Sequence, residues 1–577
     1  MPAPQPKPDA SALRPVEPQK MVDWFAPAQL SRTAVDVLIS NVFGQRIDNR
    51  LIEALSKETD GMFDYSRDAS GKPREEIVID YVADTGDGWN STYAIAYWVA
   101  QRSLPIPDVP GRADLLVFGG DEVYPVASRQ EYERRLVAPY ETALAWTDPP
   151  HPHVFAIPGN HDWYDSLVSF TRLFCAKEWF GGWLAPQKRS YFALRLPQGW
   201  WLIGTDIQLG ADIDEKQLEY FRKNVVNWMG EGDRVILCNA LPFWVMAEEA
   251  KGRDREEEKQ PEANLRFLSE KLFNGRVQVY LAGDLHHYRR HENKAGVQKI
   301  TAGGGGAFLH PTHAMQSDTL EDGAFQLRCT HPTPEQSRKE TLRLFAFAFR
   351  HREFGYLIGL LYVLTVWTVL ADLSPYGISE WTGALGESLR KGLASPMAMF
   401  WMVALFTGFF LFTETRRRYM RYILGGLHAV GHLTLVFLLG WGMTRLVTQP
   451  PFGWQFGSVS YLLAVAAALL FGGMLLGSTL FGLYLWISVN WLSEHKNDAF
   501  SSLAVEDWKS FLRMKVGKDG SLTIYPIGLD RVPRRWQVTD RPLTEPRRLP
   551  DDPDATAPRL LEKPVVVKPS GGATTQS

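Results

Sequence analysis

The chain has little cysteine and little net charge, and each shortage argues against a class of protein. Its 577 residues include 3 cysteines, Cys175, Cys238 and Cys329, which lie far apart and form no C-x-x-C pair. Neither a thiolate zinc site nor a disulfide framework is therefore expected, and the protein fits a reduced compartment. The formal net charge is -3 at pH 7. Without a basic excess, no nucleic-acid partner is expected.

Both ends of the chain lack apolar periodicity. Residues 1–20 are rich in proline and alanine and hold no apolar run, so they cannot be the hydrophobic region of a signal peptide. Residues 541–577 are dominated by proline, aspartate, arginine, threonine and glycine. We predict that both segments are disordered and that the soluble domain after residue 20 stays in the cytoplasm.

Long apolar runs are confined to the second half of the chain. Because 577 residues are too many for one hydrophobic core, we predict a soluble domain over 21–335 followed by a transmembrane region over 336–493. Four apolar runs are predicted to cross the bilayer, near 354–373, 396–413, 422–446 and 460–490. The fourth run is longer than one crossing needs, and we prefer a single tilted helix to a re-entrant pair.

Basic residues set the predicted orientation of these spans. Five precede the first span: Arg338, Lys339, Arg343, Arg350 and Arg352. Four more lie between the second and third spans: Arg416, Arg417, Arg418 and Arg421. Because basic segments resist translocation, both groups should be cytoplasmic. We therefore predict an integral membrane protein with the soluble domain and both termini in the cytoplasm.

A β-hairpin is predicted after the last span. Residues 511–516 and 521–527 alternate apolar and polar side chains around the turn Lys518-Asp519-Gly520. Because an isolated hairpin is unstable, we expect the cytoplasmic segment 494–540 to pack on the soluble domain.

In the soluble half, four short β-rich runs each end in a polar cluster. The clusters are Asp84-Thr85-Gly86-Asp87, Gly119-Gly120-Asp121-Glu122-Val123-Tyr124, Pro158-Gly159-Asn160-His161-Asp162 and Gly283-Asp284-Leu285-His286-His287. In α/β folds, ligands bind at the carboxyl ends of buried strands. We therefore predict an α/β domain whose functional site lies at these four strand ends.

The order D-x-G, G-D-x-x-Y, G-N-H-D and a degenerate G-H-x-H resembles the calcineurin-like metallophosphoesterases, including the purple acid phosphatases. The resemblance covers roughly residues 78–312 and leaves out the apolar extension. It implies a two-sheet sandwich flanked by helices, and hydrolysis of a phosphomonoester or phosphodiester by metal-activated water. The chain would be an integral-membrane variant of that superfamily.

The resemblance also implies a set of metal ligands. Asp84 and His286 would bind the first metal, with Tyr124 as a further ligand. Asn160 would bind the second metal, and Asp121 would bridge the two. Carboxylate, amide and imidazole ligands suit Mn, Fe or Zn, with one or two ions in each chain.

Two further residues are implied in catalysis. His161 would stand beside the phosphate, where it stabilises charge or protonates the leaving oxygen. Asp162 would hold the imidazole of His161 in the required tautomer.

Two departures from the family pattern fall on the second metal. Ala240 stands where the family has a histidine two residues before Pro242, and Asp284 replaces the first histidine of G-H-x-H. Either Asp284 supplies an oxygen ligand, or another side chain such as Asp87 or Asn239 fills the gap, or the second site is weak or empty. We favour Asp284, since a carboxylate would select a harder ion such as Mn or Mg.

Three more segments allow a functional and a structural interpretation. Gly303–Gly306, followed by His310 and His313, either cradles phosphate or forms a tight turn at the rim. The charged stretch 248–262 is a surface helix or a lid. His428 and His432 share one face of the third span, where they bind haem or a metal, or hydrogen-bond to a Tyr or Ser of a neighbouring span.

Substrate identity and oligomeric state do not follow from these residues. The expected partners are a phosphoester substrate, lipid-linked or soluble, and the lipid bilayer. A catalytically weak metal-binding sensor or scaffold with the same fold is the alternative function, because the second-metal ligands depart from the family. A transporter is poorly supported, since the spans contain few ionisable groups besides the two histidines.

Overall fold

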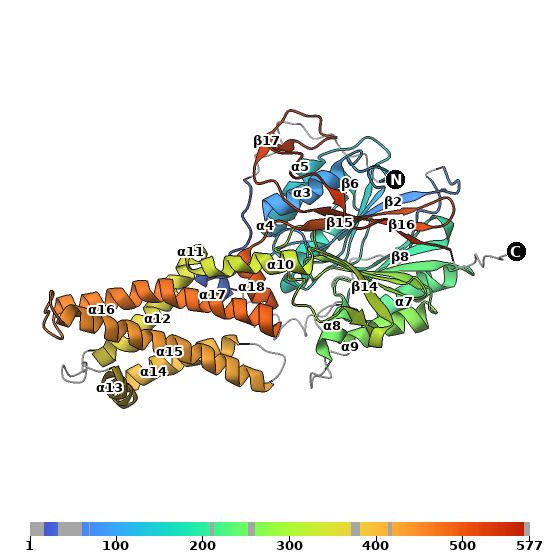
Figure 1. Cartoon of the computed structure of the whole chain (residues 1–577). Helices are drawn as coiled ribbons and strands as arrows, with labels where there is room; N and C mark the ends of the chain where they lie inside the picture. The colour runs from blue at the N-terminus through green and yellow to red at the C-terminus, as the bar shows by residue number, and fades with distance from the viewer. Residues whose placement is uncertain are drawn as a thin grey trace. The chain divides into compact units, whose positions relative to one another are not determined.

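The protein consists of two compact units (Figure 1). The computed structural model describes residues 17–32, 61–68, 70–207, 213–251, 260–370, 381–413 and 418–569. The first unit is drawn from Met1–Val22, Val35–Glu335 and Ala504–Ser577, and the second from Asp23–Ala34 and Gln336–Leu503. The second unit therefore interrupts the first in the sequence.

Two nine-stranded sheets form the first unit. One sheet has the order β19 (Arg559–Leu560), β16 (Leu522–Leu529), β15 (Lys509–Val516), β2 (Ile77–Val82), β3 (Leu115–Phe118), β4 (His153–Ala156), β6 (Trp183–Leu184) and β5 (Trp179–Phe180), with β20 (Val565–Val567) also on β16. The other has the order β1 (Phe63–Asp64), β7 (Phe192–Arg195), β8 (Trp200–Gly204), β9 (Arg234–Cys238), β10 (Val277–Ala282), β12 (Gln298–Ala302), β11 (Tyr288–Asn293), β14 (Phe325–His331) and β13 (Thr319–Leu320).

A buried apolar core fills the space between the two sheets. Alternate side chains of β2, such as Ile79 and Tyr81, pack there with Val279 and Leu281 of β10, and all four are buried. The outer face of the first sheet lies under α3 (Trp89–Ala100), α5 (Ala138–Ala143) and α6 (Val168–Phe170). The outer face of the second lies under α7 (Glu215–Asn224), α8 (Phe243–Ala250) and α9 (Gln260–Arg266). The predicted α/β two-sheet sandwich flanked by helices is confirmed.

Parallel pairing brings the carboxyl ends of the central strands to one edge. In the first sheet Val82 pairs with Phe118, and Phe118 with Ala156, so β2, β3 and β4 end level. In the second sheet β8, β9 and β10 are parallel as well. The polar clusters that follow these strands therefore emerge together.

The segment after the second unit returns to the first sheet. β15 and β16 form an antiparallel hairpin, and β15 also pairs antiparallel with β2. Its side chain Arg513 donates two hydrogen bonds of 2.7 Å to the carboxylate of Asp80, and both residues are fully buried. The hairpin is thus an internal part of the sheet.

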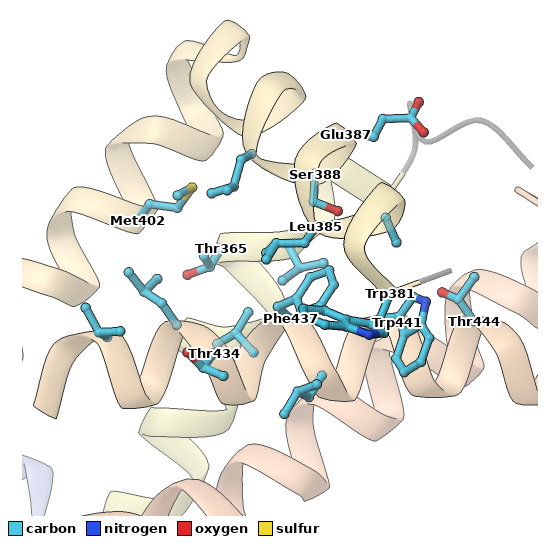
Figure 2. A pocket seen from close by; sticks show the side chains of 18 residues that line it. Thr365, Trp381, Leu385, Glu387, Ser388, Met402, Thr434, Phe437, Trp441 and Thr444 are labelled. Atoms are coloured by element: carbon cyan, nitrogen blue, oxygen red, sulfur yellow. The ribbon is translucent and has the colours of Figure 1, made fainter. Parts of the chain in front are cut away.

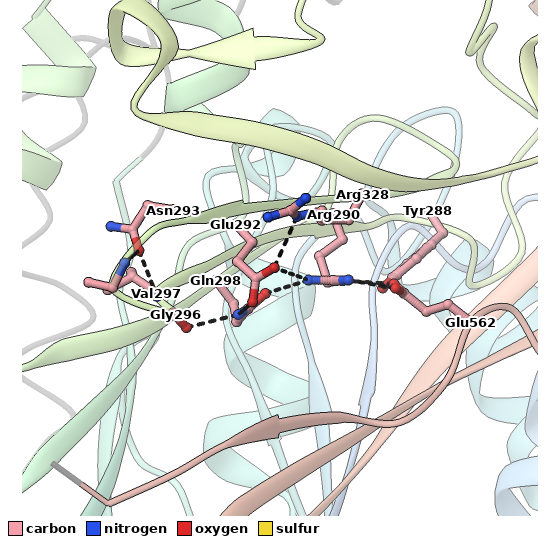
Figure 3. A network of polar contacts seen from close by, with 10 residues as sticks. Tyr288, Arg290, Glu292, Asn293, Gly296, Val297, Gln298, Arg328 and Glu562 are labelled. Carbon is pink, nitrogen blue, oxygen red and sulfur yellow. Dashed lines mark hydrogen bonds and ion pairs between the residues drawn. The ribbon is translucent and has the colours of Figure 1, made fainter. Parts of the chain in front are cut away.

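The tail is ordered where the sequence predicted disorder. Over 541–569, β18 (Arg548–Pro550) pairs with β17 (Trp536–Val538), and β19 and β20 pair with β16. Glu562 accepts hydrogen bonds from Tyr288 (2.6 Å) and from Nε and Nη2 of Arg290 (2.8 and 2.6 Å), as Figure 3 shows. Strands of two or three residues are too short to show a periodic pattern, so the order of this tail could not be predicted. Residues 1–16 and 570–577 lie outside the described residues.

The second unit is helical. Its helices are α10 (Pro334–Glu340), which begins at its boundary, α11 (Phe347–Arg350), α12 (Arg352–Leu370), α13 (Trp381–Ala394), α14 (Pro396–Phe412), α15 (Arg418–Thr448), α16 (Val459–Gly472), α17 (Ser478–Ile487) and α18 (Lys496–Leu503). Two π-helical turns, Gly473–Gly477 and Ser488–Leu492, continue α16 and α17. Residues 459–492 form a single helix, as predicted.

Fewer candidate spans are present than the four predicted. Among the described residues, Tyr419–Thr448 and Val459–Leu492 are long and apolar enough to cross a membrane. A third is reached if Trp381–Ala394 and Pro396–Phe410, which meet at 103°, count as one. The predicted second span is a helix of 17 residues, short of the roughly 20 that a crossing needs. The predicted end of the first span, 371–373, lies outside the described residues.

His428 and His432 lie on one face of α15, as their spacing predicted. Nδ1 of His432 is 2.6 Å from the hydroxyl of Tyr362 on α12, and its Nε2 is 3.2 Å from Nε2 of His428. A hydrogen bond to a neighbouring helix was the structural interpretation of this pair. No group of three or more potential ligands in the described part of the chain could hold a metal there.

Candidate metal centre

Three aspartates follow the central strands at the sheet edge. Asp84 comes after β2, Asp121 after β3 and Asp284 after β10, and the amide of Asp284 donates to Oδ1 of Asp84 (2.9 Å). Their φ angles are 56°, 53° and 64°. Left-handed backbone is costly for residues other than glycine, and such strain concentrates at functional sites. The fold thus holds three carboxylates together at an energetic cost.

The hydroxyl of Tyr124 touches three acceptors at once. It lies 3.4 Å from Oδ1 of Asp84, 3.3 Å from Oδ2 of Asp121 and 2.9 Å from Nε2 of His286. A phenol has a single proton to donate. At most one of these acceptors is therefore satisfied by Tyr124.

The tautomer of His286 is set by its other ring nitrogen. Nδ1 lies 2.6 Å from the carbonyl oxygen of Phe308, and a carbonyl only accepts, so the proton sits on Nδ1. Burial, followed by the nearby His310, holds the pKa of His286 well below its ordinary value. His286 is thus neutral and directs the lone pair of Nε2 toward Tyr124 and the aspartates, the state in which a histidine binds metal.

Negative charge at the site is not balanced by protein cations. Burial raises the pKa of Asp121 to about 6 and, with help from the charge of Asp121, that of Asp284 to about 7; it also raises the pKa of Asp84 well above its usual range. Among the ion pairs of the described residues, none joins a lysine or arginine to these three. Oδ2 of Asp84 is buried without a hydrogen-bond partner. A buried carboxylate in this state calls for a cation.

The donor set fits a divalent or trivalent metal in its chemistry. Carboxylate oxygens, a neutral imidazole and a phenol face one another, and a cation would give the orphaned oxygen of Asp84 a partner. No three histidine, cysteine, aspartate or glutamate side chains in the described ranges are already arranged to hold an ion. Small side-chain movements would therefore accompany binding.

His161 is fixed by a different partner from the one predicted. Nδ1 of His161 lies 2.7 Å from the carbonyl oxygen of Pro125, which sets its tautomer, and its amide donates to Oδ1 of Asp121 (2.9 Å). Asp162 instead accepts from the amide of Gly159 (2.8 Å) and from the hydroxyl of Tyr132. Asp162 therefore holds the loop that carries His161, and the predicted tautomer role passes to Pro125.

The residues predicted to bind the second metal make fewer contacts with one another than the residues around Tyr124 do. The side chain of Asn160 hydrogen-bonds, among the described residues, to the hydroxyl of Tyr164 at 3.5 Å. Of the alternatives, Asp87 accepts from the amides of Val22 (2.8 Å) and Phe308 (3.2 Å), so both of its oxygens are engaged. Asn239 accepts from the hydroxyl of Thr205 (2.6 Å). Asp284 remains the candidate that faces Asp84.

The glycine run packs against the site as a close-fitting turn. A Cβ on Gly303 would lie 2.1 Å from Oδ2 of Asp84, and one on Gly304 would lie 2.2 Å from Oγ of Ser510. The amides of Gly303 and Gly305 donate to the carbonyls of His287 and Ala83 (3.2 and 2.9 Å). Because these two amides already donate to carbonyl oxygens of the protein, they do not support a phosphate cradle.

Two residues near the centre were not assigned to it from the sequence. His310 stacks on His286 with ring centroids 3.9 Å apart, and the pair of histidines after the glycine run was its only signal. Lys509 on β15 is buried, and burial lowers its pKa to about 8. Its place near the centre follows from the pairing of β15 with β2, which no local pattern predicts.

The segment that carries the site matches a known protein family. Residues 77–288 match the model of the calcineurin-like phosphoesterase family. The matched range holds all four polar strand ends in full. This part of the chain is a calcineurin-like phosphoesterase domain.

Similarity to individual proteins is low. No curated protein matches the chain in sequence. Among solved structures, GAP50, the anchor in the inner membrane complex of Plasmodium, is 12% identical with a TM-score of 0.30, covering 44% of this chain and 80% of its own. Purple acid phosphatase PPD1 from yellow lupin (Lupinus luteus) seeds is 14% identical (TM-score 0.28; 41% and 45%). PhoD is 12% identical (TM-score 0.28; 44% and 63%).

Proposed function

We propose that this protein is a membrane-anchored, metal-dependent phosphoesterase that hydrolyses a phosphomonoester or phosphodiester. The observation that carries the proposal is the excess of buried acceptors at Asp84, Asp121 and Asp284. Tyr124 has one proton, which Asp84, Asp121 and His286 share, and Oδ2 of Asp84 has no partner. Catalysis of phosphoryl transfer to water needs positive charge on the phosphate oxygens. A site with unpaired carboxylates recruits that charge as metal ions.

The ligands we propose combine the contacts around Tyr124 with the family resemblance of the sequence. Asp84, His286 and Tyr124 would hold the first ion and Asp121 would be shared, while Asn160 and Asp284 would hold the second. Manganese, iron or zinc in one or two positions would neutralise the phosphate and make water nucleophilic near neutral pH.

His161 would act on the leaving group. Burial lowers its pKa, so the ring is neutral when the site is empty. The negative charge of a bound phosphoester favours the protonated ring, because an opposite charge close by stabilises the imidazolium. Held through Nδ1 by Pro125, His161 can then give a proton to the departing oxygen or stabilise its charge.

Membrane attachment is the second part of the proposal. The support is the two described helices that are long and apolar enough to cross a bilayer. The basic residues before α12 favour a cytoplasmic soluble unit with both termini inside. The hydrolysis screen described next distinguishes a lipid-linked substrate from a soluble one.

The test is a hydrolysis screen on the purified full chain with monoesters, diesters, nucleotides and phospholipids, with and without added metals. We expect metal-dependent turnover that Asp121→Ala reduces at least about a thousandfold, since several kcal/mol of transition-state stabilisation depend on the shared ligand. Asp554→Ala is the matched control, because Asp554 is an exposed aspartate of the same unit. Equal activity in both variants would remove the proposed centre.

A metal-binding sensor or scaffold is the second candidate. It is favoured by Ala240 at the position of a family ligand and by the loose placement of Asn160. In that case the wild-type chain binds metal but hydrolyses nothing in the screen. Membrane fractionation of the same preparations tests the anchoring separately.

A further inference from the structure

Asp87 lies three residues after Asp84 but belongs to neither set of proposed ligands. It is fully buried, and its two carboxylate oxygens accept hydrogen bonds from two distant parts of the chain. Oδ1 accepts from the amide of Val22 (2.8 Å), and Oδ2 accepts from the amide of Phe308 (3.2 Å). Each oxygen therefore holds a different segment in place.

The contact with Phe308 leads directly to a proposed metal ligand. While the amide of Phe308 donates to Asp87, its carbonyl oxygen lies 2.6 Å from Nδ1 of His286. The partner of the outer ring nitrogen sets the tautomer and the orientation of a metal-binding histidine. Asp87 thus holds, through a single residue, the carbonyl group that orients His286.

Backbone contacts hold the rest of the loop that carries Phe308. The amides of Gly305 and Ala307 donate to the carbonyl oxygens of Ala83 and Asp84, both at 2.9 Å. These contacts do not depend on the side chain at position 87. A change of that side chain should therefore loosen Phe308 without detaching the whole loop.

The other oxygen of Asp87 binds the N-terminal segment 19–22, which we call the strap. The strap is fixed a second time where the carbonyl oxygen of Gln19 accepts from the amide of Trp89 (2.8 Å). It lies outside residues 77–288, which match the family model. The family resemblance therefore says nothing about its role.

We propose that Asp87 and the strap are positioning elements of the metal centre. By fixing Phe308, they keep Nε2 of His286 directed at the first metal. The inference rests on the proposed function, because it assigns a support to the first-metal site named there. Asp87 is not itself a ligand and acts through His286.

The first test is Asp87→Asn in the full chain. Asparagine keeps the size, but only one of its two terminal atoms can accept, so either Val22 or Phe308 loses its acceptor. In a calorimetric titration with Mn, the Kd of the tighter ion should rise about tenfold, the lower end of the range for groups that orient metal-binding histidines. At saturating Mn, kcat should stay close to that of the wild type, since the ligands are intact.

Two carboxylates away from the centre serve as controls. Asp114 also accepts from a backbone amide, that of Val78 (2.9 Å), but it precedes the amino end of β3. Asp114→Asn should lower Tm without changing metal affinity. In the helical unit, Glu387 lines an apolar groove (Figure 2) and pairs with Lys391 at 3.6 Å. Glu387→Gln should leave metal affinity unchanged as well.

Val22→Pro tests the strap at the other oxygen of Asp87. Proline has no amide hydrogen, so Oδ1 loses its donor while Asp87 itself is unchanged. Lys20→Pro is the matched control, because within the described part of the chain the amide of Lys20 donates no hydrogen bond. Val22→Pro should weaken metal binding in the same direction as Asp87→Asn, and Lys20→Pro should not. Because a valine cannot bind metal, this agreement separates positioning from direct coordination.

Three results decide the inference. Unchanged metal affinity in both Asp87→Asn and Val22→Pro, in a wild type that binds metal and turns over, refutes this inference alone. A fall in the number of bound ions in Asp87→Asn, with Val22→Pro like the wild type, makes Asp87 a ligand and overturns the positioning role. A wild type that binds no metal removes the proposed centre and this inference with it. Tm in EDTA shows which variants fold, and Val22→Pro decides if Asp87→Asn does not.

Discussion

Each unit of this protein buries a polar cluster, and the two clusters differ in what they lack. At the sheet edge, Asp84, Asp121 and Asp284 are acceptors, and Tyr124 has one proton for Asp84, Asp121 and His286 together. In the helical unit, Tyr362, His432 and His428 follow one another at hydrogen-bond distance, and each can both donate and accept. The first cluster is short of positive charge, while the second is nearly complete by itself. A cation is therefore expected in the first and not in the second.

The largest expected difference between the two clusters is in their effect on the rate of hydrolysis. His161→Ala should lower the rate of hydrolysis about 10²- to 10⁴-fold, because it removes the group that serves the leaving oxygen. His151→Ala should have little effect, since His151 lies before the amino end of β4 while His161 follows its carboxyl end. Steady-state kinetics with an activated phosphoester measures both. Equal rates in the two variants would contradict the role of His161.

The stability of metal-free protein should fall as pH rises. The folded-state pKa of Asp284 is raised from 3.8 to about 7, so the folded chain keeps a proton that the unfolded chain releases near pH 4. Between those values the folded state binds more protons, and stability declines with pH. Asp284 alone should cost roughly 2 kcal/mol between pH 5 and 7.

Thermal unfolding in EDTA across this pH range measures that decline. Asp284→Asn should flatten it, and added Mn should raise Tm more at pH 7.5 than at pH 5, because the cation favours the charged carboxylates. A Tm that rises with pH in the metal-free wild type would show that the site is already balanced by protein charge.

Asp284 also tests the second metal position. Asp284→Asn keeps the size but removes the charge, so metal stoichiometry should fall toward one per chain and the Mn requirement should rise about 10- to 100-fold. Asp284→His restores the family pattern and should shift the preference toward Zn. Metal analysis and titration follow both. If Asp284→Asn binds and turns over like the wild type, Asp284 is not a ligand.

The smallest effect belongs to the helical cluster. Tyr362→Phe removes the hydroxyl that contacts His432, and a hydrogen bond between membrane helices is worth about 0.6 kcal/mol. We expect a small loss of stability with unchanged metal content and activity. Tyr356→Phe on the exposed side of the same helix is the control. A loss of bound metal in Tyr362→Phe would erase the distinction between the two clusters.

Local sequence patterns predicted the parts of the fold that depend on strand ends. The polar runs at Asp84, Asp121 and Asp284 could be placed at one edge because parallel strands end together. The hydrogen bond from His161 to Pro125 could not, because a backbone carbonyl leaves no trace in residue type. The ordered tail was missed for a similar reason, since β19 and β20 exist only through pairing with β16. Fewer candidate spans than predicted are found among the described residues, because the helix in the predicted second span has 17 residues and the end of the predicted first span lies outside the described ranges.

The place of β15 beside β2 has a consequence for how the protein is made. The ribosome synthesises β2 long before β15, and all of residues 336–503 emerge between them. Until then Asp80 lacks its ion pair with Arg513. The edge of β2 that will pair with β15 is also unpaired, next to the strand end that carries Asp84. The first unit therefore cannot be completed until the helical unit has left the ribosome. Biogenesis thus delays assembly of the centre until the chain has made the helices that we propose insert into the membrane.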